Sequence, residues 1–413
     1  MNQRWIILVV CLLIQGLAFI PAKAAYASVS SNGATNWQKG ETWPQDGIPP
    51  QYEKYEQIIT VAVVNFAPVW GDKEANLQKM ERFIEEAAQQ KANMIVFPEM
   101  ALQGYLVDKA APGAMQKKLA ETIPGPSTSR LAKLAGKHDM YIVLGMSEID
   151  KTDKNIFYNS AAFIAPEGVV GSYRKVHPWE PELVWCTKGN EFPIWETRYG
   201  PMGIIICYDI LWLSEPAGIY AVKGARFLAA LNAVPSLPGA EVAISGTAAD
   251  IIKGRSLTNA FFIANAGTIE RAFNETIVGT SCVVGPNFAD QAIGHFYAGP
   301  PTDPMKEEMF VATLDFAQVH ALRKLVHQIE GLNPYTKTPD RRPELYGPLA
   351  APPATVEKLT ELEKSNTKLA QSYAEVSEKQ KSIATLMYIF VATTVVFVGT
   401  TIFFAARKRE KKS

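Results

Sequence analysis

The stretch Gly203–Trp212, GIIICYDILW, ends a run of apolar residues on a single cysteine, Cys207. A short apolar run rich in isoleucine is typical of a strand that is buried on both faces. A cysteine at the end of such a strand is usually a small core residue, because free cysteine is among the most buried residue types. The alternative is a nucleophile at the carboxyl end of the strand, which needs a base and a cation close by.

Strand patterns recur on both sides of this stretch and alternate with helical patterns. The strand patterns are IITVAVVNF (58–66), MIVFPEM (94–100), YIVLGMSE (141–148) and ARFLAALNA (225–233), and residues 157–177 predict a hairpin. Residues 76–90 carry apolar side chains at helical spacing, and shorter helices are expected at 131–137 and 217–223. This alternation is typical of an α/β domain, in which catalytic groups gather at the carboxyl ends of strands.

Three of the apolar strands end in residues that carry chemistry. MIVFPEM leads to Glu99, VVGSYRKVH to Lys175, and MGIIIC to Cys207. Taken singly, the glutamate is typical of a solvated loop, the lysine of a surface hairpin and the cysteine of a core. Together they supply a proton acceptor, a cation for a developing oxyanion and a nucleophile.

Composition excludes some classes of function. The 413 residues are 47% hydrophobic and 20% charged, as is typical of a globular protein. Lys plus Arg and Asp plus Glu both number 41, so the chain lacks the basic surplus that nucleic-acid binding usually requires. The five histidines show no metal-ligand spacing, and we expect neither a metal nor another cofactor.

The segments that carry these residues resemble the nitrilase, or carbon–nitrogen hydrolase, superfamily with its Glu-Lys-Cys triad. The similar segments are VFPEM, LGMSE, FYNSAAFIAPEGVVGSYRKVH, GIIICYD, GRSLTNAFFIANAG, FVATLDFAQVHALR and RRPELYG. They follow the family order from about Ile58 to Gly347. The resemblance implies an α/β fold, a four-layer α-β-β-α sandwich of the nitrilase type, in a hydrolase domain of residues 58–350. Family members commonly pair, so a homodimer or higher oligomer is expected.

The resemblance also implies a role for each residue. Cys207 would be the nucleophile, Glu99 the general base, and Lys175 the cation that stabilises the tetrahedral intermediate. The backbone N–H of Tyr208 would complete the oxyanion hole beside Lys175.

A second family glutamate follows the lysine. ELVWCTKGN is similar to the family's E-x-x-Y-F-x-P-G-D and selects Glu182, with Glu180 as the competing choice. Cys186 stands where that pattern usually has an aromatic residue, which puts the local shape of the pocket in doubt.

The remaining residues near the triad leave two alternatives each. Trp179 and Trp185, like Trp212 and Phe192, could line a pocket for an apolar acyl group or belong to the core. Asp209 could orient the site or cap the helix that follows, and we favour the cap.

These residues predict hydrolysis of a small linear amide through a cysteine thioester, releasing ammonia or an amine and an acid. A nitrilase is the first alternative, although nitrilases usually show Cys-Trp-Glu where this chain has Cys-Tyr-Asp. Acyl transfer to a lipoprotein is disfavoured, since that related class has several membrane spans. A catalytically silent surface binding module is the alternative from another class.

The two ends of the chain predict attachment to a membrane. Residues 1–27 read as a signal peptide, residues 28–57 as an extended lead-in, and residues 383–406 as one uncharged transmembrane helix. The basic tail 407–413 favours the cytoplasmic side, which places the catalytic domain outside the cytoplasm. A heptad pattern predicts a stalk helix over residues 351–382 that could pair two chains as a coiled coil.

Four cysteines are present, and Cys11 lies in the predicted signal peptide. The other three are an odd number, so at least one free thiol is expected. A bridge between Cys186 and Cys282 remains an alternative.

Overall fold

The computed structural model describes residues 48–287 and 292–326, together with residues 365, 368, 371 and 372. The predicted signal peptide, transmembrane helix and basic tail lie outside the described residues, as does the predicted stalk apart from those four helical positions. No helix within the described part is long and apolar enough to cross a membrane. The chain divides into two compact units, residues 1–338 and 339–413, and the fold below belongs to the first.

The first sheet has six strands in the order β15-β1-β2-β3-β4-β5. Their bounds are β15 Glu308–Asp315, β1 Ile58–Asn65, β2 Met94–Val96, β3 Tyr141–Ile149, β4 Phe157–Ala165 and β5 Gly168–Arg174. The three central strands β1, β2 and β3 run parallel, and antiparallel partners flank them, with Ile58 opposite Asp315 at one side. β4 and β5 form the predicted hairpin.

The second sheet also has six strands, in the order β14-β13-β10-β8-β7-β6. Their bounds are β14 Ala292–Ala298, β13 Cys282–Asn287, β10 Phe262–Gly267, β8 Phe227–Asn232, β7 Gly200–Ile206 and β6 Trp195–Thr197. β7, β8 and β10 are parallel. A small third sheet joins β11 Glu270–Ala272, β12 Glu275–Val278 and β9 Val234–Ser236.

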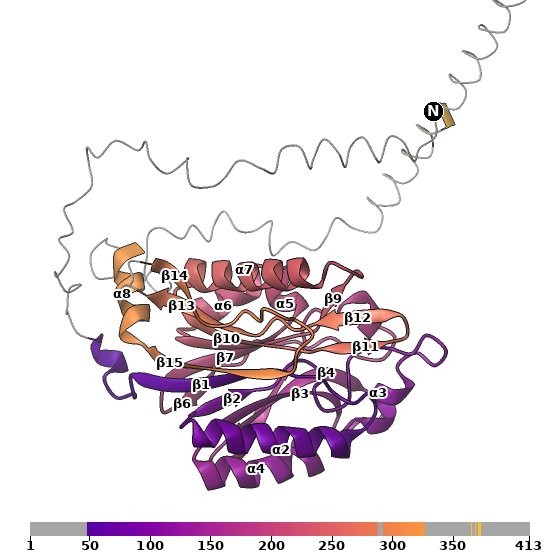
Figure 1. The fold of residues 1–413 in the computed structure, drawn as a ribbon, viewed down its shortest axis with the longest axis horizontal. Helices are drawn as coiled ribbons and strands as arrows, with labels where there is room; N and C mark the ends of the chain where they lie inside the picture. The colour runs from indigo at the N-terminus through magenta and orange to yellow at the C-terminus, as the bar shows by residue number, and fades with distance from the viewer. Residues whose placement is uncertain (1–47, 288–291, 327–364, 366–367, 369–370, 373–413) are drawn as a thin grey trace, which may run out of the picture. The chain divides into compact units, whose positions relative to one another are not determined.

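Helices cover the outer face of each large sheet, which gives the layer order α-β-β-α in Figure 1. α2 Lys73–Gln89 and α4 Pro126–His138 cover the first sheet, and α5 Tyr208–Leu211, α6 Glu215–Val222 and α7 Glu241–Asn259 cover the second. The remaining helices are η1 Pro50–Tyr52, α3 Ala114–Leu119, η2 Glu180–Glu182 and α8 Ala317–Val326.

The helix α2 begins before the apolar pattern that predicted it, and the local sequence explains this earlier start. α2 starts at Lys73 because the side chain of Asp72 accepts a hydrogen bond from Ala75 N at 3.0 Å. Its buried residues Leu77, Met80, Ile84 and Ala87 recur every three or four positions, so one face packs on the sheet.

The strand β7, which contains the isoleucines of GIIICYDILW, is buried in the core, as its composition predicts. Ile204, Ile205 and Ile206 of β7 are fully buried in the apolar cluster between and around the two sheets. Burial of each such side chain contributes about 1.5–3 kcal/mol relative to exposure.

The two sheets are also joined through the backbone beyond their strands. Phe66, next after β1, bonds to Gly267 O and accepts from Ile269 N, and Phe66 forms a bridge with Thr268. Segments that follow strands of different sheets therefore lie side by side at their carboxyl ends.

Two expectations change. The described end of the predicted lead-in is not extended, because Pro50–Tyr52 form a short helical turn in which Tyr52 is buried. The alternative bridge between Cys186 and Cys282 is wrong, since Cys186, Cys207 and Cys282 are all free thiols.

Candidate active site

Cys207 lies on a sharp turn between β7 and α5. Its φ of 45° and ψ of −97° are unusual for a residue with a side chain. The turn is held by Cys207 N, which donates to Leu231 O at 2.9 Å, and by Sγ, which lies 3.5 Å from Ala233 O. The strand is core up to Ile206, and the turn then presents the thiol at the start of a helix.

Lys175 follows β5, and its side chain is buried, including the charged ammonium group. Its Nζ donates to Glu99 Oε1 at 2.7 Å and to Glu182 Oε1 at 2.6 Å. Burial favours the neutral amine, but the charges of Glu182 and Glu99 outweigh it and raise the pKa of Lys175 well above its usual value. Lys175 is therefore a fixed cation, and an ammonium has three donors, of which two serve these carboxylates.

Glu99 has one engaged oxygen and one unpaired oxygen. Oε1 accepts from Lys175 and from Asn159 Nδ2, both at 2.7 Å. Oε2 is buried and has no hydrogen-bond partner within the described part of the chain. Burial raises the pKa of Glu99 to about 7, against the lowering effect of Lys175, so this carboxyl can exchange a proton near neutral pH.

The backbone around Glu99 is held from both sheets. Thr268 Oγ1 donates to Glu99 O at 2.6 Å from the segment after β10. On the other side, a side chain at Gly145 of β3 would lie 2.2 Å from Pro98 O and 2.7 Å from Glu99 Cα. Glycine at this position permits the close approach of the loop that carries Glu99.

Of the two candidate second glutamates, the structure brings Glu182 to Lys175. Glu182 is 1% exposed in η2, and Oε1 accepts from Lys175 Nζ and from Tyr105 OH, the latter at 2.9 Å. Its Oε2 accepts from Asn159 Nδ2 at 3.2 Å. Glu180, at the other end of the same turn, is exposed.

Sequence reasoning missed three residues that complete this arrangement, Asn159, Tyr105 and Thr268. The Asn159 amide nitrogen donates to both carboxylates, and Tyr105 donates to Glu182. Asn159 lies in the segment FYNSAAF, where a fully buried amide in an apolar strand was a signal for a polar partner. Tyr105 lies in an aperiodic loop and gave no such signal.

The thiol itself is neutral at rest. Burial raises the pKa of Cys207 well above its usual value, Glu99 raises it further, and Lys175 lowers it. Because the thiolate is the nucleophile, a base must remove the proton as the thiol attacks. The unpaired oxygen of Glu99 belongs to a carboxylate, which can accept that proton.

The predicted oxyanion donor, Tyr208, is the first residue of α5. The first N–H groups of a helix have no intrahelical partner, so this one is available to a ligand. The helix dipole also favours negative charge at this end, although α5 is short.

The two predicted tryptophans differ in position. Trp185 is buried in an apolar cluster with Met100, Tyr105 and Ala233, and its Nε1 has no hydrogen-bond partner among the described residues. Trp179 is 37% exposed. Trp185 thus packs beside residues that contact the site, and Trp179 belongs to none of the apolar clusters in the described part.

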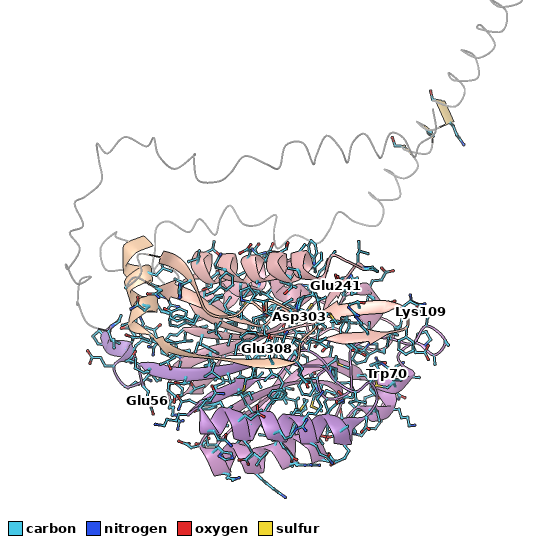
Figure 2. The ribbon with its side chains drawn as sticks, viewed as in Figure 1. Glu56, Trp70, Lys109, Glu241, Asp303 and Glu308 are labelled. Atoms are coloured by element: carbon cyan, nitrogen blue, oxygen red, sulfur yellow. The ribbon has the colours of Figure 1, made fainter. Side chains whose placement is uncertain are left out.

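Loops of the first half of the chain contact the segment around β11 and β12. Trp70 Nε1 donates to Leu106 O at 2.8 Å, and its ring contacts Phe273 with centroids 5.2 Å apart. Lys109 pairs with Glu275 at 2.7 Å. Figure 2 shows Trp70 and Lys109 at the same end of the fold. These contacts join the loop after Glu99 to the small third sheet.

Asp209 does not cap the helix that contains it, so the favoured prediction is wrong. Its carboxylate accepts hydrogen bonds from Tyr173, Val176 and His177 at the end of β5. No group of three or more His, Cys, Asp or Glu side chains in the described part is arranged to hold a metal ion.

The comparison with known families agrees with this geometry. The sequence profile described as carbon-nitrogen hydrolase matches residues 60–324. The chain belongs to the carbon–nitrogen hydrolase family. It is an enzyme of that family, with nitrilase-like and amidase-like relatives.

Two curated members of the family are similar along most of their length. A Schizosaccharomyces pombe protein named probable nitrilase is 31% identical over 296 residues, which are 71% of this chain and 98% of that protein. A citrullinase from Francisella tularensis is 30% identical over 298 residues, covering 70% of this chain and 96% of the relative.

Solved structures of carbon–nitrogen hydrolases share the fold. A carbon-nitrogen hydrolase from Helicobacter pylori has a TM-score of 0.59 at 22% identity, covering 71% of this chain and 98% of that one. A Saccharomyces cerevisiae member of branch 10 of the nitrilase superfamily has a TM-score of 0.57 at 24% identity, over 68% and 98% of the two chains.

Proposed function

We propose that this enzyme hydrolyses a small linear amide, with Cys207 as the nucleophile, Glu99 as the base and Lys175 as the oxyanion cation. The observation that carries the proposal is the asymmetry of Glu99. Its Oε1 is fixed by Lys175 and Asn159, and its buried Oε2 is unpaired among the described residues. An unpaired buried carboxylate oxygen is costly unless it has a partner during function.

The acylation step follows from these groups. Cys207 Sγ attacks the amide carbonyl carbon while its proton passes to Glu99 Oε2. Negative charge develops on the carbonyl oxygen, where the third N–H of Lys175 and the Tyr208 N–H stabilise it. The C–N bond then breaks, Glu99 returns the proton to the nitrogen, and ammonia or an amine leaves a thioester on Cys207.

The deacylation step reuses the same base. Glu99 takes a proton from water as the water oxygen attacks the thioester carbonyl. The C–S bond breaks, the carboxylic acid leaves, and the proton returns to Cys207. No net change of charge or oxidation state occurs, so the residues of the site suffice.

Glu182 serves the site through Lys175. A second carboxylate 2.6 Å from Nζ keeps a fully buried amine protonated and directs one of its three N–H groups. Asn159 and Tyr105 hold Glu182 in turn. We assign these three residues positioning roles in the reaction.

Relatives support the amide class. One is named citrullinase, and a structure from Nesterenkonia sp. AN1 that shares the fold, with a TM-score of 0.54 at 19% identity, is named an amidase. Other relatives are named nitrilases, which keeps a small nitrile as the second candidate. The Cys207-Tyr208-Asp209 sequence favours the amide.

Ammonia release from a panel of small amides and nitriles tests the assignment on the full purified chain. Cys207→Ala is expected to abolish release, while Cys282→Ala, a matched change in β13, keeps it. Turnover of nitriles without amides would replace the amidase by a nitrilase. Equal inactivity of the parent and Cys207→Ala across the panel would favour the silent binding module.

We also propose that the enzyme is a single-pass membrane protein with its catalytic domain outside the cytoplasm. The support is the uncharged run 383–406 and the basic tail 407–413 in the sequence. Resistance of the membrane-bound protein to alkaline carbonate extraction, with loss of that resistance on truncation at residue 382, is the expected result.

Pairing of two copies is a further part of the proposal. Large apolar side chains are exposed on the helical layer of the second sheet and beside it, namely Trp212, Ile219, Val222, Leu237 and Val242. A contiguous exposed apolar patch is typical of an interaction surface, and the experiment below tests whether these side chains form one. Light scattering should show a dimer for the parent and a weakened dimer for Trp212→Glu. Truncation of residues 351–382 tests the contribution of the stalk separately.

A further inference from the structure

We propose that Asp209 is a positioning residue that fixes Lys175 relative to Cys207. The proposal rests on the function proposed above, in which the lysine stabilises an oxyanion formed at the cysteine. Asp209 lies two residues after Cys207, in the first turn of α5. Val176 and His177, whose backbone N–H groups it binds, are the two residues after Lys175.

Four hydrogen bonds make this connection. Oδ1 accepts from His177 N at 2.9 Å and pairs with His177 Nδ1 at 2.7 Å. Oδ2 accepts from Tyr173 OH at 2.5 Å and from Val176 N at 3.3 Å. All four partners come from the end of β5 and the two residues beyond Lys175, so the carboxylate joins the lysine-bearing strand of the first sheet to the cysteine-bearing turn of the second.

The burial of Asp209 indicates that this connection is rigid. The residue is fully buried, whereas the His177 ring that it binds is 42% exposed. A buried carboxylate is tolerated only where donors are held in place around it. Both oxygens have two partners here, and charge-assisted hydrogen bonds of this kind are the stronger class.

Other anchors of Lys175 lie on a different side. Its N donates to Asn159 O at 2.8 Å, and its O accepts from Gly189 N at 2.8 Å. These bonds hold the lysine to β4 and to the loop after η2, which belong with the first sheet and its connections. Asp209 supplies the direct link toward Cys207, and misplacement of a catalytic group by 1 Å can cost about 100-fold in rate.

Asp209→Asn tests the link, because it keeps one acceptor oxygen and replaces the other by an NH2 group. We expect kcat on the best amide to fall by about 10- to 100-fold with little change in KM, since Lys175 acts mainly on the transition state. The matched control is Glu121→Gln. Glu121 is also a buried carboxylate that accepts from backbone and side-chain donors, at Ser127 and Lys73, but it lies in the segment between α3 and α4.

A second readout is independent of amide turnover. The rate at which iodoacetamide alkylates Cys207, followed by mass spectrometry across a pH series, reports the pKa of the thiol, which Glu99 raises and Lys175 lowers. Asp209→Asn should move the midpoint of that series upward, and Glu121→Gln should not. This readout remains valid even if the parent hydrolyses no amide, in which case the proposed function fails and the link is still tested.

Unchanged kcat and an unchanged alkylation midpoint in folded Asp209→Asn would overturn the proposal. The same holds if Glu121→Gln reproduces both effects, because the loss would then be structural. If Asp209→Asn does not yield folded protein, Tyr173→Phe carries the test, since it removes only one donor to Oδ2. An intermediate fall in kcat is expected there, and full activity would contradict the link.

Discussion

Lys175 Nζ lies 2.7 Å from Glu99 Oε1, and both side chains are fully buried. The lysine also binds Glu182 at 2.6 Å, so one ammonium faces two carboxylates. Because two buried anions exceed one cation, one of the carboxyls is easily protonated, and burial raises the pKa of Glu99 to about 7. The group that must act as the base is thus the one that titrates near neutral pH.

The pH dependence of kcat/KM should follow Glu99. A base must be ionised, so kcat/KM is expected to rise with pH through a midpoint at about 7, the pKa of Glu99, and to level off above it. The Asn159 hydrogen bond lowers that pKa, so Asn159→Ala should move the midpoint of the pH–rate curve to higher pH. Initial rates at amide concentrations well below KM check this, with exposed Asn155→Ala as the control. An unchanged midpoint in Asn159→Ala would contradict the assignment of Glu99 as the base.

Replacing each of the two glutamates of η2 by glutamine should have different effects on kcat/KM. Glu182→Gln leaves a buried lysine with one carboxylate instead of two, and kcat/KM is expected to fall by about 100-fold or more. Glu180→Gln changes an exposed side chain in the same turn and should leave kcat/KM unaltered. Steady-state kinetics of both variants distinguish them, and equal effects would show that the turn, and not the carboxylate, matters.

Tyr105 provides a test of the outer hydrogen bond. Tyr105→Phe removes the donor at 2.9 Å from Glu182 Oε1 without changing the ring. Loss of a hydrogen bond to a charged group costs about 1.5–3 kcal/mol, which corresponds to about a 10- to 100-fold fall in kcat/KM if it is expressed in the transition state. Tyr55→Phe is the matched control, because Tyr55 OH donates to Glu196 at 2.8 Å on the surface. Comparable losses in both variants would argue against a role through Glu182.

Glu270 should make stability depend on pH. Burial raises its pKa to about 7, so the folded state holds a proton that the unfolded chain releases above its ordinary value of 4.5. Stability is therefore fully present at low pH and is lost as the pH rises from about 4.5 to 7, on the order of 3 kcal/mol for a shift of this size.

Glu270→Gln should flatten that fall, because the amide oxygen can still accept from Tyr105 N and Leu106 N and carries no charge. Denaturant unfolding of the parent, Glu270→Gln and the exposed control Glu167→Gln at pH 5 and pH 8 measures the difference. A parent that gains stability toward pH 8 to the same extent as Glu270→Gln would be inconsistent with a raised pKa.

The sequence predicted what local patterns and a family resemblance can carry. Cys207, Lys175 and Glu99 follow apolar strands, and the strand patterns placed them at strand ends where the structure has them. Glu182 came from the resemblance and not from periodicity. Its contact with Lys175 depends on a short turn whose direction no pattern of apolar residues encodes.

The residues that sequence reasoning missed depend on contacts between distant segments. Tyr105 and Glu182 are separated by 77 positions, and Thr268 reaches Glu99 across 169. Asp209 was misassigned because its position in the first turn of a helix is typical of a cap, while its donors lie on the other sheet. Tertiary geometry decided these roles against the local preference.

Gly145 contains no reactive group, yet the loop that carries Glu99 lies against it with no room for a methyl group. A mutational scan read by abundance alone would score substitutions there as ordinary core damage. A scan read by turnover would place the same position among the most sensitive in the chain. Disagreement between the two scans would thus identify a residue that contributes to the chemistry only by the space it leaves empty.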